Sequence, residues 1–241
     1  MTNPIIRQLH SEDVTHQKFR NELKYICSEG ELLQLQARTQ ILCDADPHVG
    51  DEVTYHIRSI YFDDFSNRYF YENENGTDPR EKFRIRIYNA SNSQITLECK
   101  KKERTMTHKD SCRLSIDQFN RLMENALPAS AVNSELLEKF YLLQQQRNLQ
   151  PKIIVAYDRT PFVYTFGNVR ITFDRNIGST TDLSAFFEPY LPLRPILPYG
   201  KNILEVKYDE LLPNFLYDAM NLGCLRQSNF SKYYLCRKFT V

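Results

Sequence analysis

Two neighbouring stretches decide the fold of this chain: Lys82-Phe83-Arg84-Ile85-Arg86-Ile87-Tyr88 and Gln94-Ile95-Thr96-Leu97-Glu98-Cys99-Lys100-Lys101-Lys102. Side chains alternate between the two faces of a strand, so Lys82, Arg84 and Arg86 point one way and the apolar residues between them point the other. The second stretch repeats this pattern, and the polar segment 89–93 is typical of a hairpin turn. One face of the predicted hairpin is therefore a row of charge.

A single charged row is most simply the solvated outer face of an antiparallel sheet. The same sorting recurs, however, in predicted strands over 17–25, 169–174 and 204–208. The shared face carries nine basic residues (Arg20, Lys24, Lys82, Arg84, Arg86, Lys100, Lys102, Arg170 and Lys207) and four acidic ones (Glu22, Glu98, Asp174 and Glu205). Its net charge is +5, whereas the whole chain carries only +1. Positive charge is therefore sorted by strand face, which favours a functional lining.

Length and composition fit one large domain. The chain has 241 residues, 41% of them hydrophobic and 25% charged, which is enough to bury a core. We expect a domain over 17–241, preceded by an N-terminal extension over 1–16. The net charge near zero gives no general basic field for nucleic acid, so a polyanion must be met by a local concentration of Lys and Arg.

The cysteines and the apolar segments bear on cellular location. The six cysteines form no CxxC pair and no zinc-binding spacing with histidine, which favours reduced thiols in the cytosol. No apolar run has the length of a membrane span, and none near the N-terminus is typical of a signal sequence. We therefore expect a soluble, cytoplasmic protein.

The pattern predicts an α+β fold with an inverted barrel. About eight strands alternate with helices, while residues 101–109 are predicted to be a polar loop. The helices carry apolar stripes that need the apolar strand faces, so we expect an antiparallel β-barrel with the helices packed outside and the charged faces inside. Like charges turned inward cost several kcal/mol per desolvated ion unless they are hydrated or neutralised. The sequence therefore predicts a wet tunnel for an extended polyanion, most simply a chain of phosphates.

Three carboxylates interrupt the basic lining: Glu22, Glu98 and Glu205. Carboxylate oxygens together with phosphate oxygens are typical ligands of Mg²⁺ or Mn²⁺, so these residues are candidate metal ligands. Each could equally form an internal salt bridge, an alternative that is weaker for Glu205.

Eight ordered motifs resemble the catalytic domain of the VTC-type polyphosphate polymerases, which belong to the triphosphate tunnel metalloenzymes and are related to the CYTH proteins. The motifs are Arg20-x-Glu22-x-Lys24-Tyr25, Arg58-Ser59-Ile60-Tyr61-Phe62-Asp63, Lys82-x-Arg84-x-Arg86, Glu98-x-Lys100, Tyr157-x-Arg159, Val169-Arg170-Ile171-Thr172-Phe173-Asp174, Leu204-Glu205-Val206-Lys207 and Phe230-Ser231-Lys232-Tyr233. The resemblance runs from about residue 17 to the C-terminus. The chain has neither an inositol-phosphate-sensing domain nor membrane helices, and so resembles the stand-alone bacterial relatives.

The resemblance implies transfer of the γ-phosphate of ATP to a growing polyphosphate chain, with release of ADP. It assigns catalytic roles to Arg84, Arg86, Lys232 and Glu205, and metal binding (Mn²⁺ or Mg²⁺) to Glu205, with Glu22 and Glu98 as further candidates. The phosphate-binding residues, taken with those on the same predicted face, are Lys24, Lys82, Arg84, Arg86, Lys100, Lys109, Tyr157, Arg159, Arg170, Lys207, Ser231 and Lys232. The implied partners are ATP and inorganic polyphosphate, without nucleic acid and without an identified membrane-protein partner.

Two other functions are compatible with the same lining. A tunnel of this kind could hydrolyse triphosphate or short polyphosphate, in which case water is the acceptor and free phosphate the product. It could also bind polyphosphate or a nucleotide without catalysis, although anion binding alone has no use for the carboxylate of Glu205.

Overall fold

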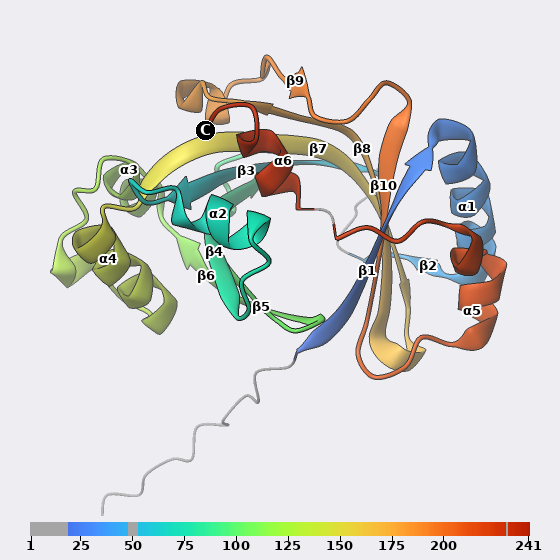
Figure 1. The fold of residues 1–241 in the computed structure, drawn as a ribbon. Helices are drawn as coiled ribbons and strands as arrows, with labels where there is room; N and C mark the ends of the chain where they lie inside the picture. Colours follow the sequence, from blue (N-terminus) through green and yellow to red (C-terminus); the bar gives the residue numbers. More distant parts are fainter. Residues whose placement is uncertain (1–18, 48–52, 230) are drawn as a thin grey trace, which may run out of the picture.

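The computed structural model describes residues 19–47, 53–229 and 231–241. Within these ranges, eight antiparallel strands close into a barrel in the order β7-β3-β4-β5-β6-β1-β10-β8, and β8 pairs back onto β7 (Figure 1). The strands are β1 (Arg20–Ser28), β3 (Tyr55–Asp63), β4 (Arg80–Tyr88), β5 (Ile95–Glu103), β6 (Met106–Leu114), β7 (Gln150–Tyr164), β8 (Val169–Thr180) and β10 (Lys201–Tyr208). Two short strands, β2 (Asp44–Ala45) and β9 (Arg194–Pro195), add to β7 and β8. The predicted barrel is confirmed.

Helices surround this ring of strands in Figure 1. They are α1 (Glu29–Leu42), α2 (Arg68–Glu74), α3 (Ile116–Met123), α4 (Glu135–Arg147), α5 (Asn214–Ala219) and α6 (Lys232–Arg237), with short 3₁₀ turns η1 (Ala129–Ala131), η2 (Phe166–Asn168), η3 (Leu183–Phe186) and η4 (Leu222–Cys224). α1 and α3 each begin at a capping box, Ser28 with Glu31 and Ser115 with Gln118, as the sequence predicts. Within the described ranges, no helix is long and apolar enough to span a membrane.

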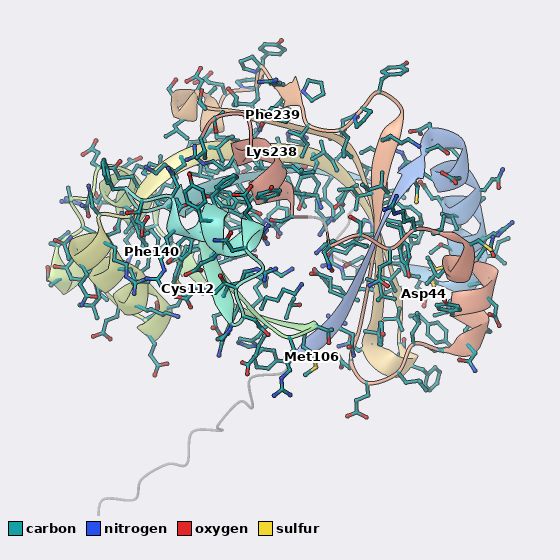
Figure 2. The ribbon with its side chains drawn as sticks, viewed as in Figure 1. Asp44, Met106, Cys112, Phe140, Lys238 and Phe239 are labelled. Carbon is teal, nitrogen blue, oxygen red and sulfur yellow. The ribbon has the colours of Figure 1, made fainter. Side chains whose placement is uncertain are left out.

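The apolar core lies outside the barrel, in two clusters. On one side, Phe83 of β4 packs against Phe140 of α4, with ring centroids 5.3 Å apart, and Figure 2 shows Phe140 on α4 beside the strands. On the other side, Leu32 of α1 and Leu216 of α5 cover Val206 of β10. Each of these apolar side chains is almost fully removed from water, which stabilises the fold by about 1.5–3 kcal/mol per side chain. The outward-facing core leaves the interior of the barrel to charged residues.

The predicted polar loop over 101–109 is wrong. Residues 101–103 belong to β5, and His108 and Lys109 belong to β6, which pairs with β5 along its whole length. β6 lacks the apolar alternation that marks a strand, because its residues are mostly polar on both faces. Among the described residues, two pairs join it to β1. Its place in the barrel therefore depends on pairing with β5 rather than on burial of an apolar face.

Other elements differ from prediction in their bounds. The predicted strands over 153–159 and 169–174 extend into β7 and β8, which pair with each other over much of their length and bulge near Asp158. Some predictions lie outside the described residues: the N-terminal extension over 1–16, positions 17 and 18 of the first strand, and Phe230 of the last motif.

Candidate functional site

The barrel encloses a cavity of about 510 Å³, and Figure 2 shows side chains projecting from the strands into the ring. In the described part of the chain, eleven Lys and Arg side chains line it, against the carboxylates of Glu22 and Glu205. The lining includes fourteen of the predicted site residues: Glu22, Lys24, Lys82, Arg84, Arg86, Lys100, Lys109, Tyr157, Arg159, Arg170, Glu205, Lys207, Ser231 and Lys232. Residues that are up to about 200 positions apart in the sequence are thus brought into one basic chamber.

A smaller cavity of about 60 Å³ adjoins this chamber. The two share six lining residues, namely Glu22, Lys24, Lys82, Lys100, Thr107 and Ser231. The smaller cavity is also lined by Arg80 and Lys102, which face each other in the register of β4 and β5. The basic lining therefore continues from one cavity into the next, as a tunnel for an extended anion requires.

Glu22 and Glu205 lie among lysines on β1 and β10. The antiparallel register sets Glu22 opposite Lys207 and Lys24 opposite Glu205. Glu22 accepts from Lys24 Nζ at 2.6 Å and from Lys100 Nζ at 2.7 Å, and Lys207 Nζ lies 2.7 Å from Glu205 Oε1. Burial alone would raise the pKa of Glu22, but Lys100 and Lys24 outweigh it and hold the pKa below its ordinary range. Lys207 and Lys24 likewise outweigh burial and lower the pKa of Glu205. Both carboxylates are therefore ionised.

Glu98 of β5 forms a separate cluster and is only 1% exposed. One of its oxygens, Oε2, accepts from Arg84 Nε at 2.6 Å, while Oε1 accepts from Lys109 Nζ at 2.8 Å. Arg86 Nη1 lies 3.8 Å from Oε2. Glu98 is thus an internal salt-bridge partner in this structure, the alternative that the sequence left open.

A third cluster is built around Asp174 of β8, which is fully buried. Asp174 accepts two bonds from Arg159, at 2.6 and 2.7 Å, and lies 2.7 Å from Lys232 Nζ. Lys232 Nζ also lies 4.7 Å from the ring centroid of Tyr157, whose hydroxyl accepts from Arg86 Nη2 at 3.3 Å. Asp174 thereby fixes two of the predicted phosphate ligands, a role that was not assigned to it from the sequence.

Several residues that line the cavity are not among the site residues predicted from the sequence. Tyr55, Tyr61 and Tyr88 line the cavity, and Tyr61 accepts a hydrogen bond from Arg84 Nη1 at 2.8 Å. Tyr55 and Tyr61 share a parity on β3, so the alternation of that strand was the signal that could have found them. Arg113 lies outside the cavity: it is exposed and donates to the Ser93 carbonyl oxygen of the β4–β5 turn.

The two arginines of β4 are expected to respond differently to removal. Arg84→Ala and Arg86→Ala should each weaken tripolyphosphate binding about tenfold or more, because each removes charge-assisted donors. Only Arg84→Ala should clearly lower the melting temperature, since it takes the nearest cation from buried Glu98. Arg86 is 3.8 Å from Glu98, and removing it also relieves repulsion with Arg84. Titration calorimetry measures the affinity for tripolyphosphate, and thermal melting measures the stability of each variant. If Arg86→Ala binds normally but melts at a much lower temperature, Arg86 has a structural role instead.

Two lysines in the chamber lack full compensation. Lys82 Nζ donates to Ser231 Oγ at 2.9 Å, while burial and the neighbouring Lys100 and Lys24 hold its pKa well below the ordinary value. Burial likewise lowers the pKa of Lys100 from 10.5 to about 7, despite its contact with Glu22. A bound polyanion would favour the protonated form of both lysines.

Tripolyphosphate binding is therefore expected to take up protons near pH 8. The measurement is titration calorimetry in two buffers of different ionisation enthalpy, and Lys100→Met should take up less than the wild type because it has no amine to protonate. The folded protein holds Lys100 with fewer protons than the unfolded chain between pH about 7 and 10.5, so without ligand its contribution makes stability rise with pH across that window. Equal uptake by both proteins would exclude Lys100 as a proton acceptor.

A divalent cation in this cavity would need oxygen ligands from the lining. Among the described residues, no three or more His, Cys, Asp or Glu side chains cluster as a metal site. Mg²⁺ is usually held by only one or two carboxylates together with substrate phosphates and water. Glu22 and Glu205, both ionised and both lining the cavity, fit that mode of binding. Glu98 fits it less well, because it does not line the cavity and, like Glu22, has both of its oxygens bound to cations.

Comparisons with known proteins bear on the family and the fold of this chain. The VTC domain matches residues 19–241. Among solved structures, a Bacillus halodurans protein described as a candidate adenylate cyclase shares the fold, with a TM-score of 0.50 at 13% identity over 86% of this chain and 88% of that one. A Hippeastrum protein described as a candidate adenylyl cyclase with a dominant triphosphatase activity has a TM-score of 0.49 at 12% identity, over 92% of this chain and 96% of that one. No curated protein matches significantly. Because the domain match covers nearly the whole chain, this protein belongs to the VTC domain family.

Proposed function

We propose that this protein is a metal-dependent phosphotransferase that moves the γ-phosphate of ATP onto a polyphosphate chain and releases ADP. The observation that carries the proposal is the chamber of eleven basic side chains in a VTC domain. A row of phosphates is the ligand that this elongated, enclosed charge would bind best, since Arg offers forked donors to phosphate oxygens and Lys a compact charge.

The proposed chemistry needs no protein nucleophile, because phosphoryl transfer depends mainly on positioning and on stabilising charge. Arg84 and Arg86 project from one face of β4, and Arg86 meets Lys232 at Tyr157. These three cations would hold the transferred phosphoryl group and stabilise the charge that develops on its oxygens. Glu205 and Glu22 would hold Mn²⁺ or Mg²⁺, which neutralises phosphate oxygens when bound.

Product analysis tests the proposal directly. Pure protein is incubated with ATP and Mn²⁺, and the phosphate products are sized by electrophoresis. We expect long chains together with ADP, and loss of both in Lys232→Met. Lys238→Met, an exposed lysine beyond the end of the same helix, is the matched control and should keep full activity. Free phosphate without chains would make the protein a hydrolase, and no turnover with intact binding would make it a binding module.

Ligand binding should also stabilise the fold. Tripolyphosphate at about a hundred times its dissociation constant is expected to add about 2.7 kcal/mol to the free energy of unfolding, because the unfolded chain has no such concentration of charge. The rise in melting temperature should shrink as salt is raised, but less steeply than for exposed ion pairs, because the lining is enclosed. Absence of any stabilisation at low salt would contradict phosphate binding in the tunnel.

A further inference from the structure

The short helix α6 brings two of the predicted phosphate ligands into the chamber. Ser231 caps the helix and accepts from the backbone N–H of Tyr234, while its hydroxyl also accepts from Lys82. Lys232, the first residue of the helix, reaches Asp174 and the ring of Tyr157. With six residues, α6 has little stability of its own, so its position depends on what anchors it.

The anchor on the barrel side is Tyr233, which is 1% exposed. Its hydroxyl donates to Asp63 Oδ2, and its ring stacks on Tyr61 with centroids 5.0 Å apart and planes at 30°. Burial and the nearby Asp63 raise the pKa of Tyr233 above its ordinary value, so the hydroxyl keeps the proton that it donates. Neither Tyr233 nor Asp63 lines the cavity.

Asp63 is itself held firmly at the end of β3. It is fully buried, and its carboxylate also accepts the backbone N–H groups of Asp64 and Tyr69 at 2.9 Å and of Phe70 at 3.1 Å. These bonds tie it to the first turn of α2, which contacts α6 (Figure 1). Asp63 is therefore rigidly held, and the Tyr233 hydroxyl links it to α6, the helix that carries Lys232.

We propose that Tyr233, held by Asp63, is a positioning residue for phosphate binding that acts through Lys232. This rests on the proposed function only in taking phosphate as the ligand. The helix α6 has other contacts as well: Tyr234 stacks on Phe70 at 5.1 Å and donates to Glu74, and the buried Arg237, on the same face as Tyr233, donates to Asn67. We expect these contacts to keep α6 attached to the barrel when the Tyr233 hydroxyl is removed. The first turn of α6 then loses its hydrogen bond to Asp63 at the end of β3.

The test is a double-mutant cycle measured as tripolyphosphate affinity by calorimetry. Tyr233→Phe keeps the ring stack and removes the hydroxyl, and it should weaken binding about tenfold. In the Lys232→Met background the same change should weaken binding less than about twofold, because residues that act through one another are not additive. Tyr234→Phe, which removes an outer hydroxyl of the same helix, is the control and should bind as the wild type does.

Two results would overturn the proposal. One is an equal loss of affinity in both backgrounds. The other is unchanged affinity with a lowered melting temperature, which a merely structural tyrosine would give.

A crystal structure of Tyr233→Phe tests the proposal without any ligand. The Lys232–Asp174 contact should open beyond about 4 Å, the limit of an ion pair, and an unchanged contact would refute the positioning role. Should the wild-type protein bind no tripolyphosphate, the proposed function fails, and that structure still decides the role of Tyr233.

Discussion

Glu205→Gln is expected to lower turnover by about a hundredfold or more while the protein remains folded. The amide has nearly the shape of the carboxylate but carries no charge, so it is a poor ligand for Mn²⁺ or Mg²⁺. A bound metal supplies several kcal/mol of stabilisation to a phosphoryl-transfer transition state, and each 1.36 kcal/mol is about tenfold in rate. The loss should appear in kcat with Mn²⁺ and in the Mn²⁺ concentration needed for half-maximal rate.

The same substitution should lower the melting temperature by a few degrees, because Lys207 loses its close partner and Lys24 a nearby carboxylate. Glu103→Gln is the matched control, since that carboxylate is exposed at the end of β5 and should affect neither turnover nor Mn²⁺ dependence. Unchanged Mn²⁺-dependent turnover in Glu205→Gln would remove Glu205 from the mechanism.

The inversion of the barrel could be predicted because it follows from strand alternation together with the apolar stripes of the helices. In β4 the apolar residues Phe83, Ile85 and Ile87 are all buried under helices, and the charged residues between them line the cavity. A strand with one apolar and one charged face allows only two placements. The apolar stripes of the helices then decide between them, since they need the apolar face.

The same reasoning failed for β6, where tertiary pairing replaces local pattern. One side of that strand faces the cavity through Thr107 and Lys109, and the other is only partly covered, as at Asp110. Neither face then has to be apolar, so the period of two that identifies strands is missing. A strand that lines the cavity on one side and lacks an apolar face on the other is therefore one that periodicity does not identify.

Charge pairing inside the tunnel was also beyond the reach of the sequence. Alternation places Glu98 and Asp174 on the inner face, but the partners of each depend on the register between neighbouring strands, β4, β5 and β6 for Glu98 and β7 and β8 for Asp174. Arg159 is set opposite Asp174 by the pairing of β7 with β8, which contains a bulge near Asp158. A bulge shifts the register by one residue and cannot be read from periodicity.

Asp174→Asn is expected to lower the free energy of unfolding by about 3–5 kcal/mol, the usual cost of leaving a buried charge without its partner. Asn fills the same space, so packing is kept and the loss is electrostatic: Arg159 and Lys232 keep their charge in a chamber that already holds many other cations. Asp158→Asn is the matched control, because its carboxylate is about one third exposed and pairs with His56 at the surface. That change should cost about 1 kcal/mol or less in urea unfolding.

The pH dependence of this difference follows from the direction of the pKa shift. Burial would raise the pKa of Asp174, but Arg159 and Lys232 hold it below its ordinary value of 3.8. A lowered carboxyl pKa stabilises the fold above the unfolded value and loses that contribution as pH falls through the folded one. The gap between wild type and Asp174→Asn should therefore be constant above about pH 5 and shrink below 3.8. Tripolyphosphate should partly restore the variant, since it supplies the missing negative charge to Lys232. A cost no larger than that of Asp158→Asn would mean that water in the chamber already screens its cations, and that Asp174 is not needed to hold them.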